Sequence, residues 1–113
     1  MKTNLQTREL VSALKKAGKT VPLWKRVAED LESSTRRMPR VNIEKLNRVV
    51  REGEIALVPG KVLSLGTLTG KMTVAAFQFS EPAREKIQVK GQALSLQELL
   101  EKNPKGSKVR IVK

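Results

Sequence analysis

The sequence predicts an α/β fold in which an N-terminal helical hairpin precedes short strands and helices that alternate around a small, largely parallel sheet. Apolar residues recur at helical spacing up to residue 32, and short apolar runs alternate with helix-capping motifs beyond residue 54. No Pro/Gly/Ser-rich linker interrupts the 113 residues, a length typical of one domain. We therefore predict a single domain over 1–113, composed of a hairpin (1–32), a basic connector with a short helix (33–53) and an α/β core (54–113).

The hairpin is predicted to contain helices over residues 3–17 and 22–32. Thr3 and Gln6 have capping-box spacing, and Gly18 suits the position just past a helix end. In the second helix the apolar residues follow i, i+3, i+4, i+7 spacing. They are Trp24, Val27, Ala28 and Leu31. Their shared face should pack against the rest of the domain.

The secondary-structure signals are less regular in residues 33–70. Asn42 can cap a short helix that Gly53 ends, because apolar residues recur between them at helical spacing. A strand over 55–58 is predicted to stop at the turn pair Pro59-Gly60. A second short strand over 61–64 and a glycine-containing loop over 66–70 would follow.

The C-terminal part predicts a regular alternation of strands and helices. Residues 72–79 are rich in Val, Ala and Phe, which indicates a central strand covered on both faces. Ser80 can cap a helix over 81–89, and Ser95 with Glu98 forms a capping box for a helix to about residue 102. Short strands are expected at 93–94 and 109–112.

A net charge of +12 and a pI near 10.5 point to a polyanionic partner. The excess of positive charge is spread evenly along the chain. Residues 1–60 carry 13 basic and 7 acidic side chains, and residues 61–113 carry 10 basic and 4 acidic ones, so each part has a net charge of +6. A basic tail on a neutral domain is therefore excluded. The folded body itself should meet the anion, unless the charge is only a solvated surface.

The residues that are missing exclude several classes of function. The chain has no Cys and no His, and Asp30 is its only aspartate. Thiol chemistry, a histidine base and a zinc site are thereby disfavoured. We expect neither turnover nor a small-molecule substrate. No apolar run approaches the roughly 20 residues of a membrane span, and the N-terminus reads as a helix and not as a signal peptide. A cytoplasmic protein that does not enter membranes is the simplest inference.

The first candidate binding segment is the basic connector. Its side chains would meet phosphate oxygens, for which the fixed fork of arginine donors is well suited. The candidates are Arg36, Arg37, Arg40, Lys45 and Arg48. Pro39 disfavours a helix at the preceding residue, so the three arginines should lie on an extended strip. A solvated basic loop is the alternative.

The second candidate is the glycine-bearing region, with Gly60, Lys61, Gly66 and Lys71. A nucleotide-binding loop is disfavoured, because three residues separate Gly66 from Gly70 where that motif has four. Glycines would let the loop approach an RNA backbone, although an ordinary turn is also compatible. Because glycines would leave this loop mobile, we expect Arg36, Arg37 and Arg40 to contribute more to binding than Lys61 and Lys71.

Aromatic residues are scarce, and all three have a place in the predicted core. Trp24 lies on the apolar face of the second helix, and Phe77 and Phe79 share one face of the central strand. None is left to stack on single-stranded bases, so folded RNA bound through phosphates, 2′-hydroxyl groups and shape is the favoured partner. A DNA-compacting architectural protein is the alternative, but no apolar wedge is evident. An RNA-processing enzyme would need a carboxylate pair or a metal cluster, and neither is visible.

Five segments of the sequence resemble one family, large-subunit ribosomal protein eighteen of the archaeal and eukaryotic type. They are RRMPRVNIEKLNR (36–48), EIALVPGKVL (54–63), KMTVAAFQFS (71–80), AREKI (83–87) and ELLEKNPKGSKVRI (98–111). This family is similar in its C-terminal part to bacterial large-subunit protein fifteen. The long basic extensions of eukaryotic members are absent, which indicates the archaeal type, and Ser64 stands where the family pattern leads us to expect a glycine.

The resemblance implies a structural protein of the large ribosomal subunit that contacts ribosomal RNA and neighbouring ribosomal proteins. It implies no catalysis and no cofactor. The family's basic connector maps onto Arg36, Arg37 and Arg40, and its glycine loop maps onto Gly60, Lys61, Gly66 and Lys71.

Overall fold

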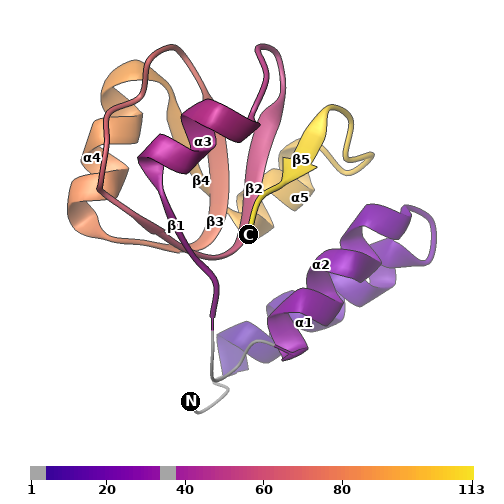
Figure 1. The fold of residues 1–113 in the computed structure, drawn as a ribbon. Helices are drawn as coiled ribbons and strands as arrows, with labels where there is room; N and C mark the ends of the chain where they lie inside the picture. Colours follow the sequence, from indigo (N-terminus) through magenta and orange to yellow (C-terminus); the bar gives the residue numbers. More distant parts are fainter. Residues whose placement is uncertain (1–4, 34–37) are drawn as a thin grey trace.

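One parallel sheet organises the chain (Figure 1). The computed structural model describes residues 5–33 and 38–113, and five strands are found within these ranges. They are β1 (Arg40–Asn42), β2 (Ile55–Leu63), β3 (Thr73–Phe79), β4 (Gln92–Ser95) and β5 (Val109–Ile111). β2 pairs with β3 and β3 pairs with β4, while β1 and β5 pair with the two ends of β2. The predicted α/β class with a small parallel sheet is confirmed.

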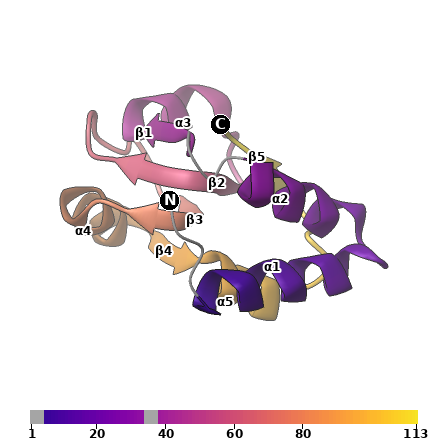
Figure 2. The same ribbon diagram turned by 90° about the horizontal axis from the view of Figure 1, so that it is seen from below.

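Helices cover both faces of this sheet (Figure 2). The described residues form α1 (Leu5–Gly18), α2 (Pro22–Ser33), α3 (Ile43–Val49), α4 (Glu81–Lys90) and α5 (Leu96–Lys102). α3 and α4 pack on one face, and α1, α2 and α5 pack on the other. The predicted hairpin of α1 and α2 is confirmed, although Thr3 of the expected capping box lies outside the described residues.

Alternating side chains of β3 pack into two hydrophobic clusters, one on each face of the sheet. Val74 and Ala76 join the cluster under α3 and α4, and Ala75 joins the cluster under the hairpin and α5. Trp24 is fully buried in the second cluster, as predicted. The expectation that Phe77 and Phe79 share a face is wrong: Phe77 packs on the second cluster and Phe79 on the first, at the point where the chain turns into α4. Burial of both faces explains why this strand is so apolar.

The prediction of a turn at Pro59-Gly60 is wrong, because β2 runs through both residues to Leu63. Val58 pairs with Ala76 and Lys61 pairs with Gln78, so two residues of β2 face one residue of β3 in a bulge. A bulge tolerates a proline that cannot donate a ladder hydrogen bond. The two short strands predicted at 55–58 and 61–64 are thus one strand.

Gly60 allows β2 to meet β1, a strand within the segment predicted to be an irregular connector. A Cβ atom at Gly60 would collide with the carbonyl oxygen of Pro39. Without one, that carbonyl accepts a hydrogen bond from the Lys61 amide at 2.8 Å. The glycine therefore serves strand pairing and not a turn.

Of the three predicted N-caps that fall on described residues, two are confirmed. The Ser80 hydroxyl accepts a hydrogen bond from the Ala83 amide, and Ser95 and Glu98 form the full capping box. Asn42 does precede α3, but its side chain accepts a hydrogen bond from the Leu65 amide instead of capping the helix. α3 ends at Val49 and not at Gly53, because Val50 already has an extended backbone.

Candidate nucleic-acid interface

The predicted connector residues occupy three different settings. Arg36 and Arg37 lie outside the described residues. Arg40 is the exposed first residue of β1, and Lys45 and Arg48 lie on α3. The Lys45 ammonium donates a hydrogen bond to the carbonyl oxygen of Lys113 at 2.8 Å, whereas the Arg48 side chain is exposed.

Strand pairing brings together two cations that were predicted to belong to separate sites. Arg40 and Lys61 are direct register partners in the parallel β1–β2 pair, and neighbouring strands lie about 4.8 Å apart. Lys61 is in turn the register partner of Gln78 on β3. The result is a row of polar side chains, Arg40–Lys61–Gln78, across one end of the sheet, which we call the sheet-end row.

Neither cation of the sheet-end row makes an ion pair with any residue that the structure describes. Arg40 is exposed and Lys61 is partly exposed, so both remain accessible to an external anion. Their backbones are fixed by the sheet, which lowers the entropy cost of ordering them on binding.

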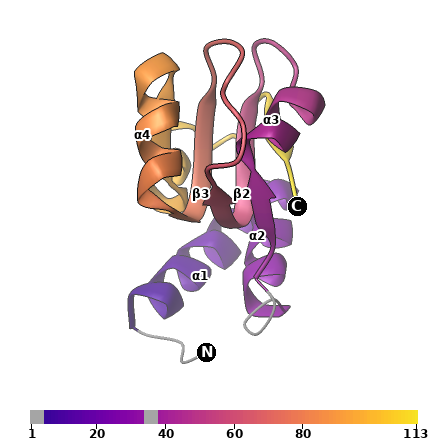
Figure 3. The ribbon, with the colours of Figure 1, turned by 60° about the vertical axis from the view of Figure 1, so that its left-hand side comes forward.

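Lys61 and Lys71 do not act as a pair, although they flank the same loop in sequence. Lys61 faces Gln78, while Lys71 precedes Thr73 at the opposite end of β3. The strand from Thr73 to Gln78 alone spans about 17 Å at 3.3 Å per residue. The connection between them is a crossover that returns over the α3/α4 face of the sheet (Figure 3).

An asparagine on α3 helps to hold the crossover loop, residues 64–72. Asn47 donates its amide to the Thr67 carbonyl oxygen at 2.8 Å and accepts from the Thr69 amide at 3.2 Å. Leu68, between these contacts, is almost fully buried in the cluster under α3 and α4. The loop is therefore part of the packed structure.

Two lysines of α4 hold the same loop from the other side. Lys86 donates to the carbonyl oxygens of Ser64 and Gly66 at 2.8 and 3.0 Å, and Lys90 donates to that of Leu68 at 2.9 Å. These hydrogen bonds argue against the expected mobility of the glycine loop. The ranking of the arginines above Lys61 and Lys71 loses that premise and stays a prediction.

Gly66, one of the two glycines of this loop, has a role in packing. At Gly66 the backbone has a φ of +102°, and a Cβ atom there would lie 2.8 Å from the Glu44 amide nitrogen. Gly66 therefore permits close packing of the loop on α3, a role that the sequence did not reveal. Ser64, where a glycine was expected, does not have a positive φ, so a serine fits.

Three other cations are neutralised within the described structure. Lys15 pairs with Glu32 at 3.1 Å, Lys113 pairs with Asp30 at 2.9 Å, and Arg110 pairs with Glu54. These contacts join residues 17, 83 and 56 positions apart, so sequence reasoning missed them. The net charge alone does not tell which cations are available to a partner.

The Arg110–Glu54 pair is bidentate, with N–O distances of 2.7 and 3.0 Å. The hydrogen bond from Arg110, together with the Arg51 backbone amide, lowers the pKa of Glu54 from near 4.5 to about 2. The pair joins β5 to the residue before β2.

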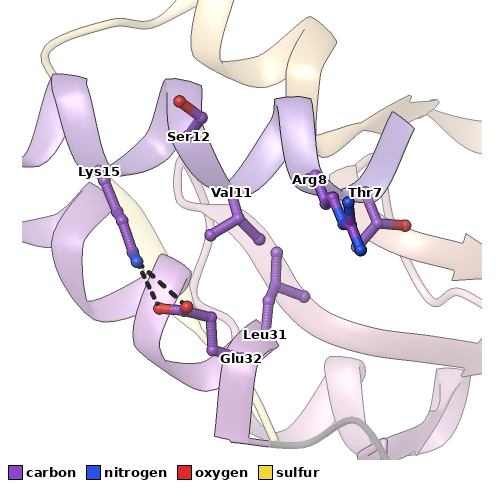
Figure 4. Close-up of a pocket in the computed structure, with 7 residues that line it drawn as sticks. All are labelled: Thr7, Arg8, Val11, Ser12, Lys15, Leu31 and Glu32. Atoms are coloured by element: carbon purple, nitrogen blue, oxygen red, sulfur yellow. Dashed lines mark hydrogen bonds and ion pairs between the residues drawn. The ribbon is translucent and has the colours of Figure 1, made fainter. Parts of the chain in front are cut away.

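A hollow between α1 and α2 is lined by both polar and apolar side chains, most of them at least partly exposed (Figure 4). It is lined by Thr7, Arg8, Val11, Ser12, Lys15, Leu31 and Glu32. The Lys15–Glu32 ion pair bridges the two helices at its side. Elsewhere in the described residues, no group of three or more Cys, His, Asp or Glu side chains could hold a metal. None of the described helices has the length and apolar character of a membrane span.

Comparison with known proteins agrees with this arrangement. Residues 19–94 match the family model described as ribosomal proteins 50S-L15, 50S-L18e and 60S-L27a. The chain belongs to this family. The matched range runs from the turn after α1 to β4 and includes the sheet-end row.

Individual relatives place the chain more narrowly within the family. The protein named large ribosomal subunit protein eL18 of Methanococcus maripaludis is 45% identical, and the match covers 99% of this chain and 96% of that protein. The eL18 of Methanosphaerula palustris is 47% identical over 99% and 95% of the two chains. That of Sulfurisphaera tokodaii is 42% identical over 98% and 93%. The resemblance to the archaeal type of the family is confirmed.

Proposed function

We propose that this protein is a structural constituent of the large subunit of the cytoplasmic ribosome and binds ribosomal RNA without catalysing a reaction. The observation that carries the proposal is the sheet-end row, in which Arg40 and Lys61 lie side by side without a carboxylate partner among the described residues. Membership of a ribosomal protein family supplies the context.

The chemistry of the row suits phosphate oxygens and 2′-hydroxyl groups. The Arg40 guanidinium can donate two parallel hydrogen bonds to one phosphate, while the Lys61 ammonium offers a compact point charge. Arg48 adds a further exposed cation on α3, the helix that directly follows β1. Arg36 and Arg37 precede this row in sequence and extend the proposed site.

The aromatic residues favour recognition of folded RNA. The Trp24 indole is fully buried and donates its N–H to the Pro104 carbonyl oxygen at 2.7 Å. Phe79 is packed on the core and lies under the Arg84 guanidinium, 5.3 Å from ring centroid to carbon. Without an exposed aromatic platform, the protein would read shape and backbone and not stacked bases.

Mass spectrometry of large subunits purified from the source cells tests the structural role. Subunits washed at moderate salt should contain this chain at the same stoichiometry as other ribosomal proteins. Its absence from washed subunits, with the chain recovered elsewhere in the same lysate, would contradict the proposal.

Binding measurements test the site. We expect Arg40→Gln combined with Lys61→Gln to weaken binding to deproteinised large-subunit RNA. The matched control combines Lys15→Gln with Lys113→Gln, which removes two cations that already pair with carboxylates. Equal losses in the two variants would show that only net charge matters and would reject the sheet-end row as a site.

A further inference from the structure

Two segments from opposite ends of the sequence lie side by side at the tip of the hairpin. Figures 1 and 2 both place the turn between α1 and α2 next to the loop between α5 and β5, residues 103–108. The Trp24 indole hydrogen bond to Pro104 joins them. Gly106 packs so closely on Leu23 that a Cβ atom there would lie 2.5 Å from the leucine Cδ2.

The segments that meet at this junction carry five exposed lysines, and we call them the hairpin surface. They are Lys16, Lys19, Lys25, Lys105 and Lys108. None makes an ion pair within the part of the chain that the structure describes. The two contributing stretches, residues 10–28 and 102–113, contain no acidic residue at all.

The loop that presents Lys105 and Lys108 is ordered by its own hydrogen bonds. Asn103 donates its side-chain amide to the Ser107 carbonyl oxygen at 2.9 Å and accepts from the Ser107 amide at 3.3 Å. Lys108 has a φ of 60°, and its carbonyl oxygen accepts from the Ile55 amide at 2.8 Å. A non-glycine residue at positive φ is uncommon and is maintained here by surrounding contacts.

The stability of the fold does not account for all of these lysines. Lys16 lies in the last turn of α1, where a cation interacts favourably with the helix dipole. Lys19, Lys105 and Lys108 lie outside helices and are exposed. Such a concentration of like charge raises the free energy of the folded state unless an anion neutralises it.

We propose that the hairpin surface is a second RNA-binding surface, which takes the phosphate backbone of an RNA strand other than the one at the sheet-end row. The two surfaces lie at opposite ends of β2: Lys108 contacts Ile55, and Lys61 is six residues further, about 20 Å along the strand. This inference rests on the proposed ribosomal RNA binding.

RNA fits this surface better than a protein partner does. Protein interfaces have an apolar centre. The large apolar side chains exposed among the described residues are Leu65 and Val89, and neither belongs to the hairpin surface. A surface whose charged residues are all cations is the electrostatic footprint of a nucleic-acid contact.

The test compares three paired variants in binding to deproteinised large-subunit RNA from Methanococcus maripaludis over a range of salt concentrations. Lys19→Gln with Lys105→Gln probes the hairpin surface, Arg40→Gln with Lys61→Gln probes the sheet-end row, and Lys15→Gln with Lys113→Gln is the control. Circular dichroism and thermal melting establish first that each variant is folded. Each lysine that contacts a phosphate should reduce the log–log salt slope by about 1.

We expect the hairpin pair to reduce the slope by about 2 relative to the control pair, and the reduction to be additive with that of the sheet-end pair. A hairpin variant indistinguishable from the control, beside a weakened sheet-end variant, would overturn this inference and leave the proposed function standing. An acidic protein would then be the partner to seek. If RNA binding by the wild-type protein did not depend on salt concentration, both proposals would be overturned.

Discussion

The protein contains two loops with similar composition and opposite roles. Residues 64–72 and 103–108 both contain glycine and lysine, and an asparagine side chain braces each through backbone contacts. Asn47 braces the first loop from α3, and Asn103 braces the second from within. From the local sequence alone either loop could approach RNA.

The two loops differ in their tertiary contacts. Lysines of α4 direct their ammonium groups onto carbonyl oxygens of the first loop, and Leu68 enters the core. The second loop is fastened through the Pro104 carbonyl and Gly106, which leaves Lys105 and Lys108 exposed. The comparison teaches that glycine and lysine content does not tell whether a loop packs into the core. Tertiary contacts decide this, and Lys71 of the packed first loop is exposed as well.

The largest expected effect concerns the packed side chain of the first loop. Leu68→Ala should lower the free energy of unfolding by about 2–5 kcal/mol, because a buried leucine leaves a cavity when truncated. The matched change in the second loop, Lys105→Ala, should alter it by less than about 0.5 kcal/mol because the side chain is exposed. Urea unfolding measures both. Equal effects would contradict the division into a packed and a presenting loop.

The next largest effect on stability is expected from changing one of the two glycines of the first loop. Gly66→Ala should cost about 1–3 kcal/mol of stability, since alanine is strained at a φ of +102° and its Cβ would crowd Glu44. Gly70→Ala is the control, because a Cβ at Gly70 meets nothing within 4 Å. If the first loop were loosely attached, the two variants would melt at similar temperatures.

Smaller effects are expected from the two bracing asparagines, and they should differ in kind. Asn47→Ala should destabilise the protein by about 1–2 kcal/mol, because the Thr67 and Thr69 backbone groups lose their partner. Asn103→Ala should cost less stability and weaken RNA binding more, because it loosens the backbone that presents Lys105. Thermal melting and RNA titration on the same samples separate the two outcomes, and a reversed pattern would refute the comparison.

The smallest expected effect is the acid sensitivity of the ion pair between Glu54 and Arg110, a residue of β5, the strand after the second loop. Because Arg110 lowers the pKa of Glu54 to about 2, the ionised pair stabilises the fold above the ordinary pKa near 4.5. That stabilisation is lost as the pH falls from about 4.5 towards 2. Glu54→Gln should therefore be less stable than the wild type at neutral pH, and the difference should shrink as the pH approaches 2. A pH-independent difference in denaturant midpoint would rule this out.

Sequence reasoning predicted the elements with strong local signals. Ser80 and Ser95 marked helix starts that the structure confirms, and the apolar run of β3 marked a strand covered on both faces. It failed where a distant residue decides the local structure. The Pro59-Gly60 pair is a turn signal by itself, and only the approach of the Pro39 carbonyl makes it a bulge within β2.

The candidate site was predictable in part for the same reason. Arg40 and Lys61 were each identified as basic residues, but their adjacency depends on the register of β1 with β2. Contacts between residues up to 83 positions apart decide which cations are neutralised and which lysines lie at the hairpin tip. No local pattern reports such contacts, so the lysines of the hairpin surface had no signal beyond their charge.

The salt dependence of binding to folded large-subunit RNA tests the central claim most directly. If exposed, unpaired cations grip phosphates, the logarithm of the association constant should fall linearly with the logarithm of salt concentration, by about 0.7 to 0.9 for each phosphate neutralised. Contacts from both surfaces together should give a steep slope, of magnitude about 3 or more. A slope near zero, with binding retained at high salt, would contradict the account.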